Sequence, residues 1–302
     1  MIKLRKTFMF IIPIAVFSLV SCEKADDGEF KIAASFAPMY DFTKRIVGDK
    51  AEVINIVGDN EPHGFEPNDP KTAAFVEDAD LLVAYGHNID SWAVNMNSSK
   101  YFDATTDVTF YSALDQDGNE TNTVDPHAWL SLLDAKIMIN NIATKVISID
   151  PDNKETYENN LEETLTSFTD LYNEYVHAFE SDALYSKIIV TSHEAFRYFA
   201  MDFGLVQKGI ADIANNEPSS AQITKIIDYI KDNDVHYIFL EELDEPGFVD
   251  TIVEELRKDD YDINYEVLNA YEGVKEEDWD SGNDYLSVME SNLLTIKETL
   301  GN

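Results

Sequence analysis

Three histidines and one glutamate are the side chains best suited to chemistry in this sequence, and each lies in a short turn-like segment that follows an apolar run: His63, His127, His193 and Glu272. Loops held by a rigid scaffold are where ligand-binding residues concentrate. Neutral imidazole nitrogens and a carboxylate oxygen suit a divalent cation, and this set would fill a tetrahedral shell around Zn²⁺. The four residues are widely separated in the chain, which predicts a site assembled between lobes and not a local finger.

Several residues near these positions, and the remaining histidines, have less specific interpretations. Acidic residues beside the histidines could accept hydrogen bonds from the imidazoles and orient them, although sequence neighbours often point elsewhere. These candidates are Glu61, Asp125 and Glu194. The other histidines and two tryptophans are predicted as surface, structural or core residues: His87, His177, His236, Trp92 and Trp129.

Strand-like and helix-like segments alternate along both halves of the chain, as is needed to position the four residues. In the first half, strands are predicted at 31–36, 52–57 and 80–85, with helices at 39–47 and 69–77. The second half repeats the theme with strands at 188–192 and 235–240 around a helix at 219–231. Such alternation implies parallel sheets flanked by helices. The carboxyl ends of the strands of both lobes would then face one cleft.

A long helical pattern lies between the two halves. Asp150 offers an N-cap before Pro151, and apolar residues then recur at steps of three and four to about residue 180. At 1.5 Å per residue this helix would be about 45 Å long. We therefore predict an α/β fold of two similar lobes joined by one rigid linking helix, with the site in the inter-lobe cleft. The predicted divisions are an N-terminal lobe at 30–150, the linking helix at 151–184 and a C-terminal lobe at 185–302.

The N-terminus has the pattern of a secretory signal, with basic residues ahead of an apolar run that is too short to span a bilayer. Residues 1–21 are predicted as this signal, and the sequence Leu-Val-Ser-Cys that ends at Cys22 resembles a bacterial lipobox. Cys22 would then carry the lipid and 22–29 would form a tether; the alternative is a secretory signal with an incidental cysteine. Cys22 is the single cysteine, so no internal disulfide can form and a metal site must use nitrogen and oxygen ligands.

The formal net charge of −36 makes nucleic acid and anionic lipid poor partners. A negative field of this strength raises the local concentration of cations, although salt screens it over about 10 Å. Acidity alone does not indicate metal binding, because a solvated acidic surface explains most of the charge.

Six segments, in order along nearly the whole chain after the signal, resemble one family: the zinc and manganese ABC-transporter solute-binding proteins (cluster A-I). They are Ala-Ser-Phe-Ala-Pro-Met-Tyr-Asp at 34–41, Glu-Pro-His-Gly-Phe-Glu-Pro at 61–67, Asp-Pro-His-Ala-Trp-Leu at 125–130, Val-Thr-Ser-His-Glu-Ala-Phe at 190–196, Ile-Phe-Leu-Glu-Glu at 238–242 and Asp-Tyr-Leu-Ser-Val-Met at 284–289. The resemblance implies a monomeric, lipid-anchored receptor on the extracytoplasmic face of the bacterial cell membrane. Such a receptor captures a divalent metal and hands it to a permease with its ATPase.

The family's ligand positions match His63, His127 and His193, and its fourth carboxylate falls at Glu272, where the wording Asn-Ala-Tyr-Glu departs from the usual Asn-Pro-Leu-Glu. Water would complete the shell if Glu272 did not reach. Manganese-directed members commonly place Glu where this chain has His193, so three imidazoles favour Zn²⁺ as the transported ligand and leave Mn²⁺ as the alternative. The loop 115–125 is short and lacks histidine, unlike the long His-rich loop of many zinc-directed relatives.

Two other classes remain as alternatives. A secreted zinc hydrolase would also use three protein ligands, but the sequence after His193 does not have His-Glu-x-x-His spacing and the chain has no Gly-x-Ser-x-Gly segment, so we do not expect an enzyme. A surface adhesin or structural lipoprotein would bind metal only incidentally. For a transport receptor, we expect a movement of the second lobe, with the Glu272 loop, to release the ion.

Overall fold

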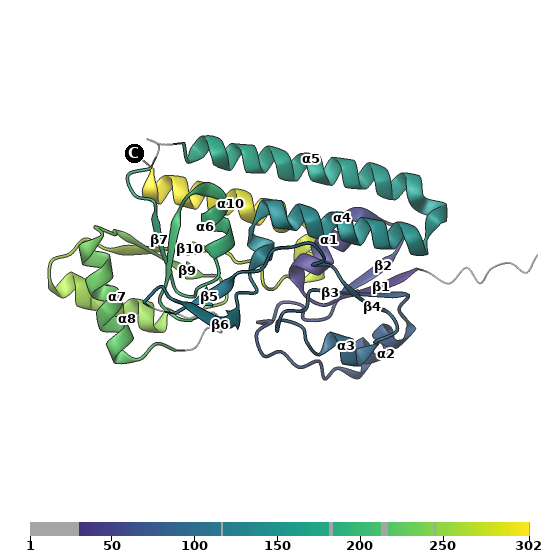
Figure 1. Cartoon of the computed structure of the whole chain (residues 1–302), viewed down its shortest axis with the longest axis horizontal. Coiled ribbons are helices and arrows are strands. Elements are labelled where there is room, and N and C mark those ends of the chain that lie inside the picture. Colours follow the sequence, from purple (N-terminus) through teal and green to yellow (C-terminus); the bar gives the residue numbers. More distant parts are fainter. Residues whose placement is uncertain (1–29, 116, 181–183, 213–216, 245, 302) are drawn as a thin grey trace, which may run out of the picture.

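The computed structural model describes residues 30–115, 117–180, 184–212, 217–244 and 246–301. The predicted signal at 1–21 and the tether with Cys22 lie outside these residues. Two sheets, one in each half of the chain, lie side by side below a pair of long helices (Figure 1). This arrangement confirms the predicted α/β fold with parallel sheets flanked by helices.

The sheet of the first half contains four parallel strands in the order β2-β1-β3-β4. Its central strands are almost fully buried, as expected for parallel strands covered on both faces. The strands are β1 (Lys31–Ala34), β2 (Glu52–Asn55), β3 (Leu81–Ala84) and β4 (Tyr101–Asp103). The helices of this half are α1 (Ala37–Val47), α2 (Pro70–Asp78), α3 (Ala93–Met96) and α4 (Leu132–Ile149), with the 3₁₀ turn η1 (Ala128–Leu130) before α4.

The sheet of the second half is also four-stranded and parallel, in the order β10-β9-β7-β8. Its strands are β7 (Ile188–Thr191), β8 (Val206–Gly209), β9 (Tyr237–Glu241) and β10 (Asn264–Leu268). Its helices are α6 (Arg197–Phe203), α7 (Ser220–Asp232), α8 (Gly247–Lys258), α9 (Glu276–Asp280) and α10 (Tyr285–Leu300). A capping box between Ser219 and Gln222 begins α7, which satisfies backbone donors that the first turn leaves free.

An antiparallel hairpin of β5 (Ser112–Leu114) and β6 (Glu120–Val124) precedes His127. The sequence interpretation treats 115–125 only as a short loop, because β6 is mostly exposed and has no apolar alternation to mark it as a strand. A hydrogen bond from the Asp125 N–H to the Tyr111 carbonyl, 2.9 Å long, closes the hairpin two residues before His127.

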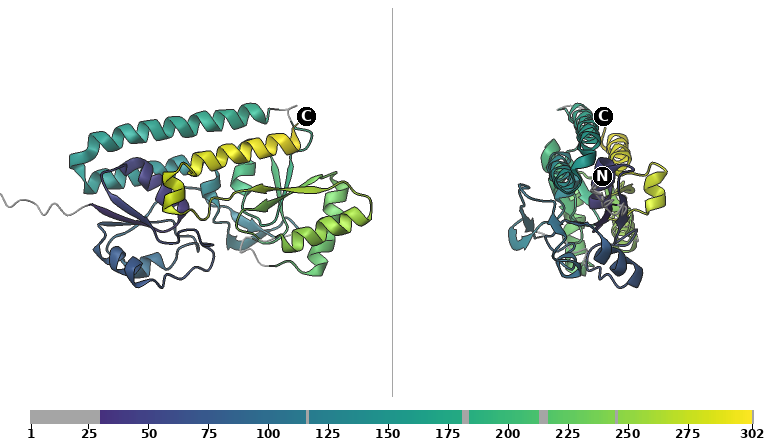
Figure 2. Two further views of the ribbon diagram at one scale, coloured as in Figure 1. Left: turned by 180° about the vertical axis from the view of Figure 1, so that it is seen from behind. Right: turned by 90° about the vertical axis from the view of Figure 1, so that its right-hand side faces the viewer.

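The predicted long helix is present as α5 (Lys154–Ala178), preceded by the 3₁₀ turn η2 (Pro151–Asn153). Its 25 residues span about 38 Å. It runs along both halves of the molecule, with α10 alongside (Figure 2). The helix begins three residues later than predicted because Pro151 starts a tighter turn.

Aromatic packing joins α1, α5 and α10. Phe168 on α5 stacks on Tyr285 of α10 with ring centroids 5.2 Å apart, and Phe42 on α1 contacts both rings edge-on. All three side chains are fully buried, and burying one Phe stabilises a fold by about 1.5–3 kcal/mol. One apolar cluster therefore extends from the first sheet to the last helix.

No helix within the described ranges has both the length and the apolar character needed to cross a membrane.

Candidate metal centre

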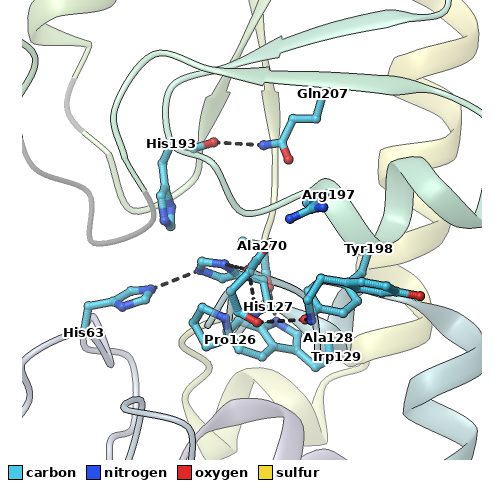
Figure 3. A network of polar contacts seen from close by, with 12 residues as sticks. His63, Pro126, His127, Ala128, Trp129, His193, Arg197, Tyr198, Gln207 and Ala270 are labelled. Atoms are coloured by element: carbon cyan, nitrogen blue, oxygen red, sulfur yellow. Dashed lines mark hydrogen bonds and ion pairs between the residues drawn. The ribbon is translucent and has the colours of Figure 1, made fainter. Parts of the chain in front are cut away.

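Two imidazoles and one carboxylate form a close triangle between the sheets. The Nε2 atoms of His63 and His127 are 3.2 Å apart, and Oε1 of Glu272 is 3.4 Å from the first and 3.6 Å from the second. His193 approaches the pair from the second half of the chain, as Figure 3 shows. Ligand nitrogens of the three histidines all lie within 4.8 Å of one another. The structure thus brings together all four residues that the sequence singled out.

Loops at the ends of the strands supply the four side chains. His63 follows β2 in a turn closed by a hydrogen bond from the Phe65 N–H to the Pro62 carbonyl, and His193 lies two residues after β7. His127 precedes η1, and Glu272 lies beyond the end of β10. In parallel sheets, ligands bind outside the carboxyl ends of strands, so the placement follows from the topology.

Asp125 fixes the orientation of His127. Its Oδ1 lies 2.8 Å from Nδ1 of His127, which leaves Nε2 directed into the site. Both residues are fully buried. Burial lowers the pKa of His127, while the contact with Asp125 opposes this effect. This contact agrees with the predicted orienting role of Asp125, because it leaves Nε2 of His127 facing His63 and Glu272.

Glu241 has the same relationship to His193 and is the functional residue that the sequence interpretation missed. Its Oε2 lies 3.1 Å from Nδ1 of His193, and both side chains are buried. Burial raises the pKa of Glu241 to about 7, although the charge of His193 opposes the rise. Glu241 ends the apolar strand β9, so its place at the carboxyl edge of the sheet was the available signal.

The carboxylate of Glu272 is buried next to the imidazoles of His63 and His127. Burial acts to raise its pKa, but the contact with His63 and the charges of the three histidines lower it to about 2. Its Oε1 is buried and accepts no hydrogen bond among the described residues. Since a buried carboxylate oxygen needs compensation, a cation between these groups would supply it.

The two other acidic neighbours act differently from Asp125. Glu61 accepts a hydrogen bond from the backbone N–H of His63 at 3.1 Å. Burial, together with the charge of Glu272, raises the pKa of Glu61 to about 8. Burial raises the pKa of Glu194 to about 7. Glu61 also lines a small pocket beside the site with Glu241 and Glu272, so both halves of the chain contribute to it.

The remaining histidines lie outside the cluster. His87 stacks on Phe110 with ring centroids 3.7 Å apart and lines the same surface hollow as His63. His177 is exposed on α5, and His236 stacks on Tyr261. These positions agree with the surface and structural interpretation of all three.

The dimensions of the triangle match a tetrahedral zinc shell. With Zn–N and Zn–O bonds of about 2.0–2.1 Å, the edges of such a shell are about 3.3–3.4 Å. The edges between His63, His127 and Glu272 are 3.2, 3.4 and 3.6 Å. His193 supplies a fourth donor at the open corner, so the arrangement can hold one small divalent cation.

Comparisons with known proteins agree with this site. Residues 32–299 match the family model described as zinc-uptake complex component A, periplasmic. The chain is 31% identical to the zinc-binding lipoprotein AdcA of Streptococcus pneumoniae, over 98% of this chain but only 61% of the relative. It is 33% identical to the high-affinity zinc uptake system protein ZnuA of Bacillus subtilis, over 89% of this chain and 87% of that one.

Solved structures give the same result. The Zn(II)-bound ZnuA-like domain of AdcA from Streptococcus pneumoniae matches with a TM-score of 0.74 and 32% identity, over 91% of this chain and all of that one. The laminin-binding protein Lmb of Streptococcus agalactiae, described as having adhesin and metal-transporting activity, matches with a TM-score of 0.79 and 29% identity, over 90% of this chain and 99% of that one. The family-model match over residues 32–299 places this chain in the ZnuA family of zinc-uptake components.

Proposed function

We propose that this protein captures Zn²⁺ outside the cytoplasm and delivers it to the permease of an ABC transporter. Its ligands are His63, His127, His193 and Glu272. The observation that carries the proposal is the triangle of His63, His127 and Glu272, whose 3.2–3.6 Å edges fit tetrahedral zinc. Membership of the zinc-uptake family supports the same role.

Three imidazoles favour zinc over manganese as the transported ion, because manganese prefers oxygen ligands. His193 is the position that decides between them. Replacing His193 with Glu would give two imidazoles and two carboxylates, and this variant is expected to move the preference toward Mn²⁺. A manganese-directed receptor is therefore the first alternative within the same family.

The site is built to hold an ion and not to activate water. Catalytic zinc keeps one position open for water, whereas four protein donors converge here. His127, His193 and Glu272 are at most 4% exposed, so a substrate has little access to the ion. The relatives are metal-binding and transport proteins by name, which supports capture over catalysis.

The surroundings of the protein follow from the same proposal. A lipid on Cys22, with residues 22–29 as a tether, would hold the chain at the extracytoplasmic face of the cell membrane. The protein would act as a monomer and dock on the permease and ATPase complex, with no role for nucleic acid. The divisions at residues 150 and 184 between the lobes and the linking helix are proposed as well.

A surface adhesin is the second candidate, and the likeness to the laminin-binding protein of Streptococcus agalactiae is the observation that favours it. Binding of the soluble chain to immobilised laminin, with and without zinc, tests it. Saturable binding to laminin would support an adhesin role in addition to transport. Absence of binding would leave transport as the single proposed function.

Metal content and competitive titration on the chain from residue 23 test the main proposal. One zinc per chain, displaced poorly by manganese and weakened by His193→Ala, is the expected result. His177→Ala is the matched control, because His177 is exposed on α5 and belongs to none of the clusters of possible metal ligands among the described residues. Failure of both ions to bind tightly would overturn the receptor assignment.

A further inference from the structure

A buried carboxylate in α1 gathers hydrogen bonds from the far end of the chain. Asp41 is fully buried, and its Oδ2 accepts from the Tyr271 hydroxyl at 2.9 Å, the Trp279 indole N–H at 2.7 Å and the Tyr285 backbone N–H at 2.8 Å. Arg45 pairs with the other oxygen of Asp41. One carboxylate therefore holds three points of the segment 271–285 against the first half of the molecule.

The positive partner of Asp41 extends this attachment. Arg45 also forms a 2.6 Å ion pair with Asp284, the N-cap of α10. Burying a carboxylate is costly unless the charge is paired and hydrogen-bonded, so the Arg45 guanidinium and the three hydrogen bonds together compensate the charge of Asp41. The start of α10 and the loop before it are thus tied to α1 through a single polar network.

The chain on the other side of Glu272 is also attached to the first half. The Val274 N–H donates to the Gly58 carbonyl at 2.9 Å, and the Asn55 side chain donates to the Val274 carbonyl at 2.9 Å. A Cβ on Gly273 would lie 3.0 Å from the backbone carbon of Asp59, so the two loops are in close backbone contact. Glu272 is consequently held from both sides.

Trp129 provides a further link close to the metal ligands. Its indole N–H donates to the Ala270 carbonyl at 2.8 Å, and its own carbonyl accepts from the Tyr285 hydroxyl at 2.6 Å. Trp129 is fully buried two residues after His127. Its contacts therefore couple the loop before Glu272 to the segment that carries another ligand.

Tyr271 has a backbone conformation that needs such support. Its φ of 54° lies in the left-handed region, which is costly for a bulky aromatic residue. Its N–H donates to Asn269 Oδ1 at 2.6 Å, and its hydroxyl reaches Asp41. The adjacent Glu272 carboxylate reaches His63 and His127 instead.

We infer that Asp41 is a positioning residue for the fourth metal ligand: by holding Tyr271, it fixes the backbone from which Glu272 reaches the cation. The inference rests on the proposed function, in which Glu272 binds Zn²⁺. Under this inference Glu272 belongs with His63 and His127 to the group of ligands held by the N-terminal lobe, although Glu272 lies near the C-terminal end of the sequence. His193 is then the ligand carried by the second sheet.

A double-mutant cycle in zinc affinity tests this inference. Tyr271→Phe removes only the hydroxyl that reaches Asp41, and we expect it to raise the Kd for Zn²⁺ about 10-fold, as loss of an outer hydrogen bond does at other metal sites. In the Glu272→Gln background the same change should alter the Kd by less than about twofold, because the carboxylate through which it acts is absent.

Tyr175→Phe is the matched control, since it removes another buried tyrosine hydroxyl, one that bonds to the Met289 carbonyl on α10 and not to the network around Asp41. Trp279→Phe removes a second donor from Asp41 and should weaken zinc binding in the same direction. Thermal unfolding of the metal-free variants checks that each is folded.

Two results would overturn the inference while the proposed function stands. The first is tight zinc binding by the wild type with an unchanged Kd in both Tyr271→Phe and Trp279→Phe. The second is a Tyr271→Phe change that weakens zinc affinity by the same factor whether or not the Glu272 carboxylate is present. A wild type that does not bind zinc would instead overturn the proposed function itself, and the inference with it.

Discussion

Nδ1 of His193 lies 3.1 Å from Oε2 of Glu241, and the two residues stand at the carboxyl ends of the neighbouring strands β7 and β9. This contact fixes which ring nitrogen of His193 faces the site. An outer carboxylate of this kind orients the imidazole and strengthens it as a ligand. We therefore expect Glu241 to affect metal affinity through His193, without belonging to the proposed ligand set.

Glu241→Gln should weaken zinc binding by about 10- to 100-fold while leaving one zinc per chain at saturation. The neutral amide accepts a hydrogen bond less strongly from the imidazole and does not compensate positive charge. Competition against a chelator of known affinity measures the effect. Glu266→Gln, an exposed change on β10, is the control and should leave the Kd unaltered. Equal affinities for Glu241→Gln and the wild type would contradict the role.

Zinc should stabilise the wild type against unfolding and have little effect on His127→Ala. A ligand that binds only the folded state adds RT ln(1 + [L]/Kd), which is about 2.7 kcal/mol when free zinc is 100 times Kd. His127 is buried and has a short contact with His63, so its loss removes a central donor. Thermal melts with zinc and with a chelator measure the difference. An undiminished zinc shift in His127→Ala would exclude His127 as a ligand.

Gly273→Ala should weaken zinc binding and lower the unfolding free energy by about 1–3 kcal/mol, the usual cost of overpacking. The added Cβ would lie 3.0–3.2 Å from backbone atoms of Asp59 and Asn60, which cannot rotate away. The loop that carries Glu272 must therefore shift. Gly247→Ala at the start of α8 is the control, because its Cβ would have open space. Denaturant unfolding and zinc titration of both variants decide the outcome.

Asp202→Asn should become more stable relative to the wild type as pH rises from 4 to 7.5. Burial raises the pKa of Asp202 to about 6. The folded state then holds the proton more tightly than the unfolded state, so the stability linked to the protonated form is present below pH 4 and is lost as pH rises through about 6.

The variant cannot ionise, and the difference in unfolding free energy should change by about 2 kcal/mol in its favour across this range. Ser131 donates a hydrogen bond to Asp202, and denaturant unfolding in the presence of a chelator removes the contribution of any bound metal. Burial and the charge of Asp202 also raise the pKa of Asp134 to about 6, so the measured difference includes the response of Asp134. Asp228→Asn, an exposed change on α7, is the control. A difference between Asp202→Asn and the wild type that stays constant from pH 4 to 7.5 would contradict the prediction.

The loop that carries Glu272 is attached differently from what its place in the sequence suggests. The sequence places Glu272 in the second half and predicts that its loop moves with the second lobe. Val274 and Tyr271 instead attach this loop to Gly58 and Asp41 of the first half. Because these bonds cross between distant segments, no local pattern in the sequence indicates them.

Local patterns in the sequence were sufficient for the donor types, the alternation of strands and helices, and the long helix α5. Imidazole and carboxylate chemistry depends only on residue identity, and periodicity reports which face of a helix or strand is buried. These features predicted His63, His127, His193 and Glu272, which the structure brings together. Helix α5 differs from the predicted helix only in where it begins and ends.

Only the tertiary structure decided which carboxylate contacts which imidazole, and which half of the molecule holds each proposed metal ligand. Glu241 reaches His193 across neighbouring strands, and Asp41 reaches Tyr271 across 230 residues of chain. Such pairings depend on strand order and on the packing of α10 against α5. Because the free energy of a long-range contact depends on what the rest of the fold buries around it, neither partner carries a local signature of the other.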